Sequence, residues 1–280
     1  MNAITTHSAR PADSTGSPAA GPTRTRPSRL SGQAGKTSDR PSRLSGRLGA
    51  AAAVAGIAYT LSWAAGLALP VPNLAVTASG ADVIARYGSH LAAVQAQFAL
   101  IEGLPAIGLA VVAALLALAA RRAGARRLSV AAAASGGIAA VISLTQYALG
   151  LALTGWALPG RAPGPVSGLF EAVNRLDGAK MLALTVLGIT AAAVAGPGGL
   201  LPRWLRFAGL ALAAAITVSG MGYLLLFQAL APMAYPAGML LLIFVTGTGV
   251  ALGRRARASA DGAGSRTGQA REDGGCPGLA

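Results

Sequence analysis

The chain has 280 residues, of which 53% are hydrophobic and 11% are charged, whereas about 25% of the residues in an average soluble domain are charged. Together with a mean hydropathy of +0.56, this composition excludes a water-soluble globular domain, a coiled coil and a disulfide-stapled secreted domain. The 38 glycines follow no Gly-X-Y period, which also excludes a collagen. These exclusions leave a protein that crosses a membrane several times.

The first 47 residues differ sharply from the rest of the chain. They contain 24 Ser, Thr, Pro or Gly residues, eight basic residues and no aromatic residue. Such a segment cannot bury enough apolar surface to offset the entropy lost on ordering, so we expect a disordered tail. Within it the heptad RPSRLSG occurs twice, at 26–32 and at 40–46. The repeat indicates a duplication in an unconstrained tail or, alternatively, a basic contact with anionic lipid head groups.

Six apolar blocks follow this tail, at 48–69, 92–120, 128–154, 181–201, 207–229 and 236–253. At 1.5 Å per residue, a helix of about 20 residues crosses a hydrocarbon core of about 30 Å, and every block is near or above that length. Glu102 is the only charged side chain in the blocks. The sequence therefore predicts an all-α bundle of six transmembrane helices over 48–253, followed by a disordered tail at 254–280.

The distribution of Lys and Arg predicts the orientation of these spans. With the N-terminus inside, the tails and the inner loops carry 19 basic residues, and the outer loops carry only four, namely Arg86, Arg161, Arg175 and Lys180. Cytoplasmic loops have an excess of Lys and Arg, so we expect a multi-pass protein of the plasma membrane with both termini in the cytoplasm. The net charge of +14 then follows from topology, and we expect no nucleic-acid partner.

Few residues of the chain are suited to catalysis or metal binding. The two histidines, His7 and His90, and the single cysteine, Cys276, are isolated from one another in the sequence. No spacing typical of a zinc site and no Gly-x-Ser-x-Gly turn occurs. We therefore expect a protein that is not an enzyme, with no catalytic residues, no metal ligands and no cofactor.

Glu102, in the second block, is the residue that most requires an explanation. A carboxylate in hydrocarbon is costly, so such groups face a bundle interior, a cavity or a partner. Gln95 lies seven residues earlier, on the same face of a regular α-helix, and Pro105 is expected to kink the helix three residues later. We interpret Gln95, Glu102 and Pro105 as a candidate intramembrane polar site. It is either a proton or cation site, or a carboxylic acid that joins helices by hydrogen bonds.

A second group of polar residues precedes the fourth block. In helical spacing Glu171 and Arg175 form an i,i+4 pair, and Asp177 and Lys180 form an i,i+3 pair. The segment is predicted to be a short amphipathic helix on the outer interface, either a solvated connector or a lid over an outward-facing cavity. We expect Lys180, or else Arg175, to approach Glu102. The candidate outer-face partners are Glu171, Asn174, Arg175, Asp177 and Lys180.

Three stretches carry a resemblance to a known family: GIAY at 56–59, EGLP at 102–105 and NRLDGAKM at 174–181. Over residues 45–257 the chain resembles integral membrane proteins of high-GC Gram-positive bacteria, a domain of unknown function with about six spans. The resemblance implies the topology and no catalytic or binding residue.

The sequence supports two functional hypotheses. The first is a non-catalytic packing or modulatory role in the membrane. The alternative is a small-solute or ion transporter that uses Glu102 and the outer-loop charges. The lipid bilayer is the expected partner in both, and the candidate protein partners are other membrane proteins and further copies of this chain. A water-accessible cavity near Glu102 favours transport, whereas a dry, packed Glu102 favours the packing role.

Overall fold

The computed structural model describes residues 40–196 and 199–272, with side chains from 47 to 259, and this part of the chain is helical. Its only strand-like feature is an isolated bridge between Ala195 and Leu201. The helices are α1 (Arg40–Leu67), α2 (Gly80–Tyr87), α3 (Leu91–Phe98), η1 (Ala99–Gly103), α4 (Leu104–Arg122), α5 (Arg126–Ala152), η2 (Leu153–Ala157), α6 (Pro163–Val194), α7 (Arg203–Leu224), η3 (Ala231–Met233) and α8 (Ala234–Glu272).

Six helical segments of the described residues are long and apolar enough to cross a membrane, which confirms the predicted number. They are Arg47–Leu67, Leu91–Arg122, Arg126–Ala157, Pro163–Val194, Arg203–Leu224 and Ala231–Ser259. Five of them overlap the predicted blocks closely, with ends that differ by a few residues.

The fourth segment corrects the prediction. Residues 163–194 form one continuous helix, α6, so the predicted span at 181–201 and the predicted interfacial helix before it are parts of the same element. The pairs Glu171–Arg175 and Asp177–Lys180 form and continue the helical register into the apolar part. The helix ends before the run Gly196-Pro-Gly-Gly, because proline and glycine disfavour a helix interior. At 1.5 Å per residue α6 is about 48 Å long, longer than a hydrocarbon core.

The first and last helices also extend into the segments for which disorder was predicted. Helix α1 begins at Arg40 and α8 continues to Glu272, where disorder was predicted for 1–47 and 254–280. Extending an existing helix needs no new nucleus, and arginine, which favours helix, occurs in both extensions. The remaining tail residues, 1–39 and 273–280, lie outside the described residues.

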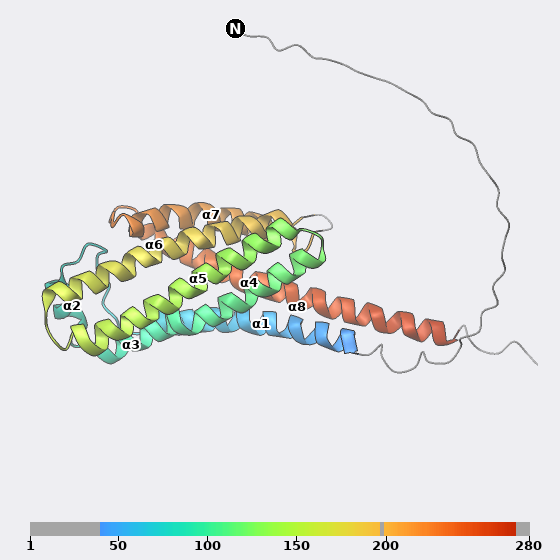
Figure 1. The fold of residues 1–280 in the computed structure, drawn as a ribbon, viewed down its shortest axis with the longest axis horizontal. Helices are drawn as coiled ribbons and strands as arrows, with labels where there is room; N and C mark the ends of the chain where they lie inside the picture. Colours follow the sequence, from blue (N-terminus) through green and yellow to red (C-terminus); the bar gives the residue numbers. More distant parts are fainter. Residues whose placement is uncertain (1–39, 197–198, 273–280) are drawn as a thin grey trace, which may run out of the picture. The chain divides into compact units, whose positions relative to one another are not determined.

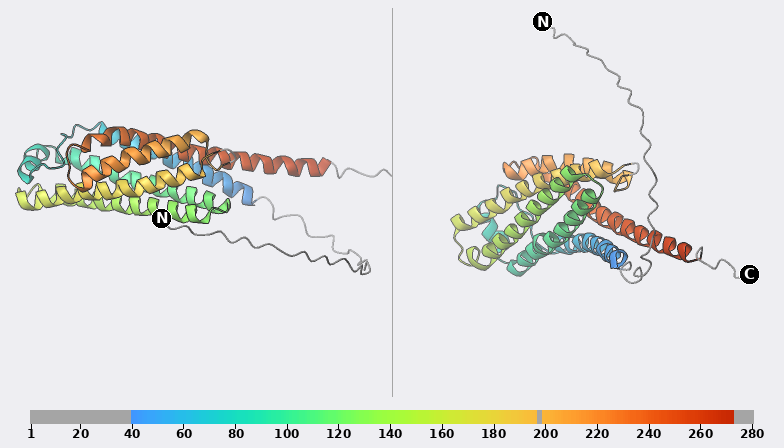
Figure 2. Two further views of the ribbon diagram at one scale, coloured as in Figure 1. Left: turned by 90° about the horizontal axis from the view of Figure 1, so that it is seen from above. Right: turned by 45° about the vertical axis from the view of Figure 1, so that its right-hand side comes forward.

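The six long segments pack in chain order and close into a ring. Helix α1 packs against α4, α4 against α5, α5 against α6, α6 against α7 and α7 against α8, and α8 returns to α1. Figure 1 shows α1 and α8 side by side, and Figure 2 shows the same pair from two further directions. The first and last spans are therefore neighbours, although they are the most distant in sequence.

Small residues allow the backbones of α1 and α8 to approach closely. A Cβ on Gly56 would lie 3.0 Å from the carbonyl oxygen of Val245, and one on Gly253 would lie 2.9 Å from that of Gly49. The Thr246 hydroxyl donates a hydrogen bond to the Gly56 carbonyl at 3.1 Å. Close glycine contacts and hydroxyl bonds are typical of helix pairs in membranes. The small residues of the last span, Gly253 among them, thus serve an interface within the chain.

Helix α2 covers one end of the ring. Its N-cap residue, Ser79, forms a reciprocal capping box with Asp82, which satisfies free N–H groups at the helix start. Val83 of α2 belongs to a small buried cluster with Leu153, Val166 and other residues of η2 and α6. This packing places α2 against the first half of α6, at the end of the bundle where α1 ends and α8 begins.

Candidate functional site

A buried polar cluster lies between the segments that contain η1, α5 and α6. Glu102 belongs to η1, which is a turn of π-helix. Its side chain is only 9% exposed and that of Lys180 only 7% exposed. Both side chains lie within candidate membrane spans, where charged groups are costly unless they are paired.

The π-helical turn follows from Pro105, the second residue of α4. Proline has no N–H to donate to the carbonyl four residues earlier, so the regular ladder is broken. The Leu104 N–H instead donates to the carbonyl of Ala99, five residues back. The Leu100 carbonyl, which loses its α-helical donor, accepts a hydrogen bond of 2.7 Å from the Ser62 hydroxyl of α1. The predicted interruption at Pro105 therefore takes the form of a π turn that carries Glu102.

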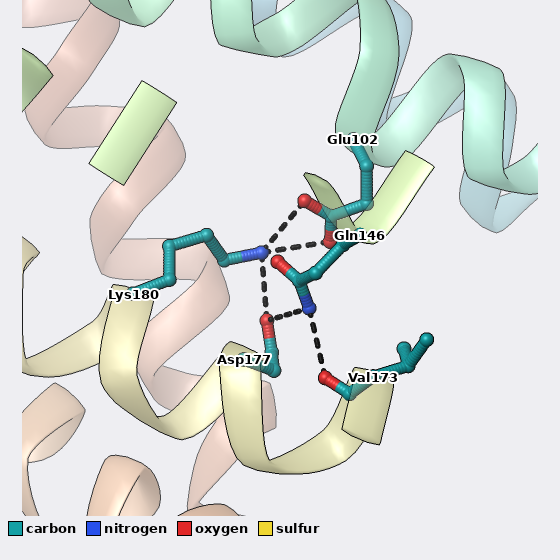
Figure 3. Close-up of polar contacts among 5 residues, drawn as sticks. All are labelled: Glu102, Gln146, Val173, Asp177 and Lys180. Carbon is teal, nitrogen blue, oxygen red and sulfur yellow. Dashed lines mark hydrogen bonds and ion pairs between the residues drawn. The ribbon is translucent and has the colours of Figure 1, made fainter. Parts of the chain in front are cut away.

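Lys180 is the centre of the cluster. Its Nζ donates to both carboxylate oxygens of Glu102, at 2.7 and 2.8 Å, and lies 2.6 Å from Oδ1 of Asp177. All three of these contacts of the ammonium group are with carboxylate oxygens. Figure 3 shows Lys180 reaching between the two carboxylates. The contact between Lys180 and Glu102 that we predicted is present.

Gln146, on α5, is the member of the cluster that sequence reasoning missed. Its Nε2 donates to the Val173 carbonyl at 3.1 Å and to Asp177 at 3.4 Å. The side chain is buried, and its Oε1 has no hydrogen-bond partner in the described part of the chain. The available signal was that Gln146 is the one amide side chain in the predicted block 128–154, because a buried amide needs partners.

The structure does not place Gln95 in the site, contrary to the expectation. Gln95 is exposed, whereas Glu102 is buried. The π turn inserts one extra residue between Gln95 and Glu102. This extra residue rotates the helix before the turn by about 100° relative to a regular α-helix. A separation of seven residues therefore no longer corresponds to two turns, so Gln95 and Glu102 lie on different faces of the segment.

The other candidate partners divide between the cluster and the surface. Asp177 joins the cluster, but Glu171 and Arg175 form an exposed pair with each other, with 2.8 Å between Arg175 Nε and Glu171 Oε1. Asn174 is buried and donates to the Phe170 carbonyl at 2.9 Å, within its own helix. Arg175 therefore does not approach Glu102. Because Lys180 is buried and Asp177 is half-buried at helix contacts, the segment is not a solvated connector.

A cavity of about 570 Å³ adjoins the cluster, and Asp177 and Lys180 form part of its wall. Pockets that bind small molecules have about 300–1,000 Å³. Asp177 is the more accessible of the two, with a side chain that is 19% exposed. Glu102 lies behind Lys180 and does not line the cavity. The cluster is thus packed on one side and faces open space on the other.

The rest of the cavity wall comes from α1, α7, α8 and two connecting segments. Three aromatic residues contribute to it, Trp63 of α1, Tyr223 of α7 and Tyr235 of α8. The segments before α2 and after α7 also line the cavity, and the Val76 N–H of the first donates to Gln228 Oε1 of the second at 2.9 Å. The cavity therefore lies at the end of the bundle that α2 covers.

The opposite end of the bundle is basic. A smaller pocket of about 300 Å³ there is lined by residues that include Arg122, at the end of α4, and Arg255 of α8. Arg255 donates to the Gly199 carbonyl at 2.8 Å. Arg126 and Arg203 are the first residues of α5 and α7, which begin at this same end.

No metal site appears in the described residues, since no group of three or more His, Cys, Asp or Glu side chains there could hold a metal ion. Within this part of the chain the cluster can bind a proton or a cation, and the cavity has room for a small molecule. Comparison with protein-family models, with curated proteins and with solved structures gives no match. The resemblance based on residues 56–59, 102–105 and 174–181 stays a prediction.

Proposed function

We propose that this chain is a small-solute transporter of the plasma membrane, embedded in the lipid bilayer with both termini in the cytoplasm. Its binding site is the cavity beside Asp177 and Lys180. The observation that carries the proposal is the position of these two charged residues, which belong to a buried ion cluster and also form the wall of a 570 Å³ space. Ionisable groups inside a membrane domain, next to a cavity, are typical of substrate and ion pathways.

The proposed orientation is supported by the basic end of the bundle. The arginines in the last turn of α4, in the first turns of α5 and α7 and in the second half of α8 lie at the end opposite the cavity. The positive-inside rule assigns such an end to the cytoplasm. The cavity then faces the outside, where a solute would enter.

The packing or modulatory role is the competing hypothesis. It requires that the cluster be dry on every side and that its only task be to join helices. The cavity next to Asp177 favours the transporter, and no enzymatic step is part of the proposal.

Cysteine labelling tests this function. The single native cysteine, Cys276, is replaced by serine, and Met181→Cys, which lines the cavity, is compared with Thr185→Cys. Thr185 lies one turn further along α6, and its hydroxyl bonds the Met181 carbonyl at 3.1 Å. A membrane-impermeant maleimide is added to right-side-out and to inside-out vesicles.

A transporter with this site is expected to label at Met181→Cys from the outside and, more slowly, from the inside, while Thr185→Cys stays unlabelled from both sides. Labelling from the outside alone would indicate a receptor or binding protein. Protection of Met181→Cys from both sides would contradict the proposal and support the packing role.

A further inference from the structure

We infer that the solute is a monovalent organic cation with an apolar body. This inference rests on the proposed function and specifies the substrate class of the same cavity. Three features of the described residues support it: the charge of the cluster, the contacts of Lys180 with carboxylates alone and the chemistry of the cavity wall.

The cluster contains more negative than positive charge. Two carboxylates, those of Glu102 and Asp177, share one ammonium group, that of Lys180. No other basic side chain forms an ion pair with them within the described part of the chain. With both carboxylates ionised the cluster has a formal charge of −1, which one positive charge neutralises. In a low-dielectric interior such an unbalanced charge attracts a cation strongly.

The geometry places this excess charge at the cavity. Lys180 contacts both oxygens of Glu102 but only one oxygen of Asp177. The side chain of Asp177 is 19% exposed, against 9% for Glu102. Both partners of Asp177, Lys180 and Gln146, contact its Oδ1. A ligand in the cavity therefore meets the carboxylate whose second oxygen has no hydrogen bond or ion pair within the described residues.

Lys180 itself is not available to bind an anion. Every contact that its Nζ makes in the described residues is with a carboxylate oxygen. A substrate carboxylate or phosphate at Lys180 would add negative charge next to both Glu102 and Asp177. The cluster therefore selects against anions.

The wall of the cavity favours an organic cation over an inorganic one. Trp63, Tyr223 and Tyr235 surround it together with apolar residues such as Met181 and Leu184. Aromatic faces attract organic ammonium groups, and quaternary ammonium ligands are commonly held by them. A volume of about 570 Å³ is many times the space of about 30 Å³ that one water molecule occupies. An inorganic ion would leave most of it unfilled.

The fluorescence of Trp63 provides a direct test. The full chain has three tryptophans, so the double variant Trp156→Phe/Trp204→Phe retains Trp63 as its single tryptophan. The purified protein, in uncharged maltoside micelles, is titrated with three probes that share a phenyl ring: benzyltrimethylammonium, the neutral N-benzylacetamide and the anionic phenylacetate. Benzyltrimethylammonium is expected to change the emission saturably, with a Kd at least tenfold lower than that of either other probe.

Two variants test the role of the carboxylate. Asp177→Asn keeps the shape of the side chain and removes the charge, so the Kd for benzyltrimethylammonium should rise at least tenfold. Glu171→Gln is the matched control, because it removes an exposed acid from the same helix outside the cavity, and it should leave the Kd unchanged. If Asp177→Asn fails to fold, the comparison of the three probes on the parent protein still tests whether the cavity prefers a cation.

The outcomes separate this inference from the proposed function. Equal or tighter binding of the neutral or anionic probe, or an unchanged Kd in Asp177→Asn, would overturn the cation class while the cavity remains a solute site. No change with any probe would also overturn the cation class. In each of these cases the labelling of Met181→Cys still decides whether the cavity belongs to a transporter.

Discussion

Lys180 determines whether two carboxylates can be buried in the helix bundle. Bringing charges out of water carries a desolvation penalty that only good geometry and complete hydrogen bonding offset. Lys180 supplies the counter-charge, with its Nζ 2.6 to 2.8 Å from three carboxylate oxygens. Its removal leaves two like charges close together without a counter-charge.

We therefore predict that Lys180→Met destabilises the protein much more than Glu102→Gln. Methionine keeps the length of the side chain, but the variant leaves buried carboxylates unpaired, which costs about 3–5 kcal/mol. Glu102→Gln leaves Lys180 paired with Asp177, so its cost should be smaller. Thermal and chemical unfolding in detergent measure both, with the exposed Glu171→Gln as the control.

The pair also predicts strong coupling between the two positions. In the double variant Lys180→Met/Glu102→Gln, one stranded carboxylate is removed, so part of the lost stability should return. We expect a coupling free energy within the range of about 0.5–3 kcal/mol found for residues in contact. Simple additivity of the two single changes would show that the contact contributes nothing to stability.

Close helix contacts and local caps set the arrangement of the elements around this cluster. Helix α5, which carries Gln146, packs on α4 and on α6. A Cβ on Gly136 of α5 would overlap the Cβ of Ala113 on α4, whereas a Cβ on the next residue, Gly137, would meet no atom within 4 Å. The two neighbouring glycines therefore have different roles.

We predict that Gly136→Ala separates α4 from α5 and destabilises the protein by about 1–3 kcal/mol, as overpacking usually does. Gly137→Ala should leave the stability unchanged or raise it by up to about 1 kcal/mol, since alanine favours helix. Unfolding midpoints of the two variants in the same detergent provide the comparison. A larger loss for Gly137→Ala than for Gly136→Ala would contradict the α4–α5 contact.

The start of α2 has a pH-dependent cap outside the spans. Ser79 donates to Asp82 Oδ2 through its hydroxyl at 2.7 Å and its N–H at 3.2 Å, and these hydrogen bonds hold the pKa of Asp82 below its ordinary value. Because the folded state favours the ionised form, the stabilising effect is present above the ordinary pKa of about 3.9. It is lost as the pH falls through the lowered value.

We accordingly predict faster amide hydrogen exchange over residues 80–87 at pH 3 than at pH 6, after correction for intrinsic rates. The variant Asp82→Asn cannot titrate at this position and should show fast exchange at both pH values. An identical pH response in the variant would mean that another group controls the end of α2.

At the scale of the whole molecule, the ring of helices joins the first span to the last and separates two chemically different ends. One end has the cavity and α2, and the other has arginine-rich ends of helices. An even number of spans returns the chain to the side on which it started, which agrees with arginines beside both α1 and α8.

A topology reporter tests this arrangement. We predict that a reporter inserted at Gly124, between α4 and α5, or fused after Ala280 is cytoplasmic. A reporter inserted within 70–79 or within 158–162 should be external. Alkaline phosphatase and green fluorescent protein fusions give opposite signals and check each other. An external C-terminal fusion would contradict the even number of spans.

From the sequence alone we predicted the number of candidate spans, their approximate positions and the importance of Glu102. These are local properties, because the length of an apolar block and the presence of one charge within it do not depend on the rest of the chain. The contact of Glu102 with Lys180 was also predictable, since a buried carboxylate requires a partner and few basic residues lie near the outer ends of the blocks. The pairs within α6 followed from their helical spacing.

The remaining members of the site depend on tertiary contacts. The π turn at 99–103 moved Gln95 away from Glu102, and the packing of α5 on α6 brought Gln146 to Asp177. The continuity of α6 placed Asp177 and Lys180 inside the bundle, where the sequence had indicated an interfacial segment. The cavity depends on residues from α1, α6, α7 and α8 together. Such features arise from contacts between distant segments and from the register of one helix against another, and no local pattern of residues encodes them.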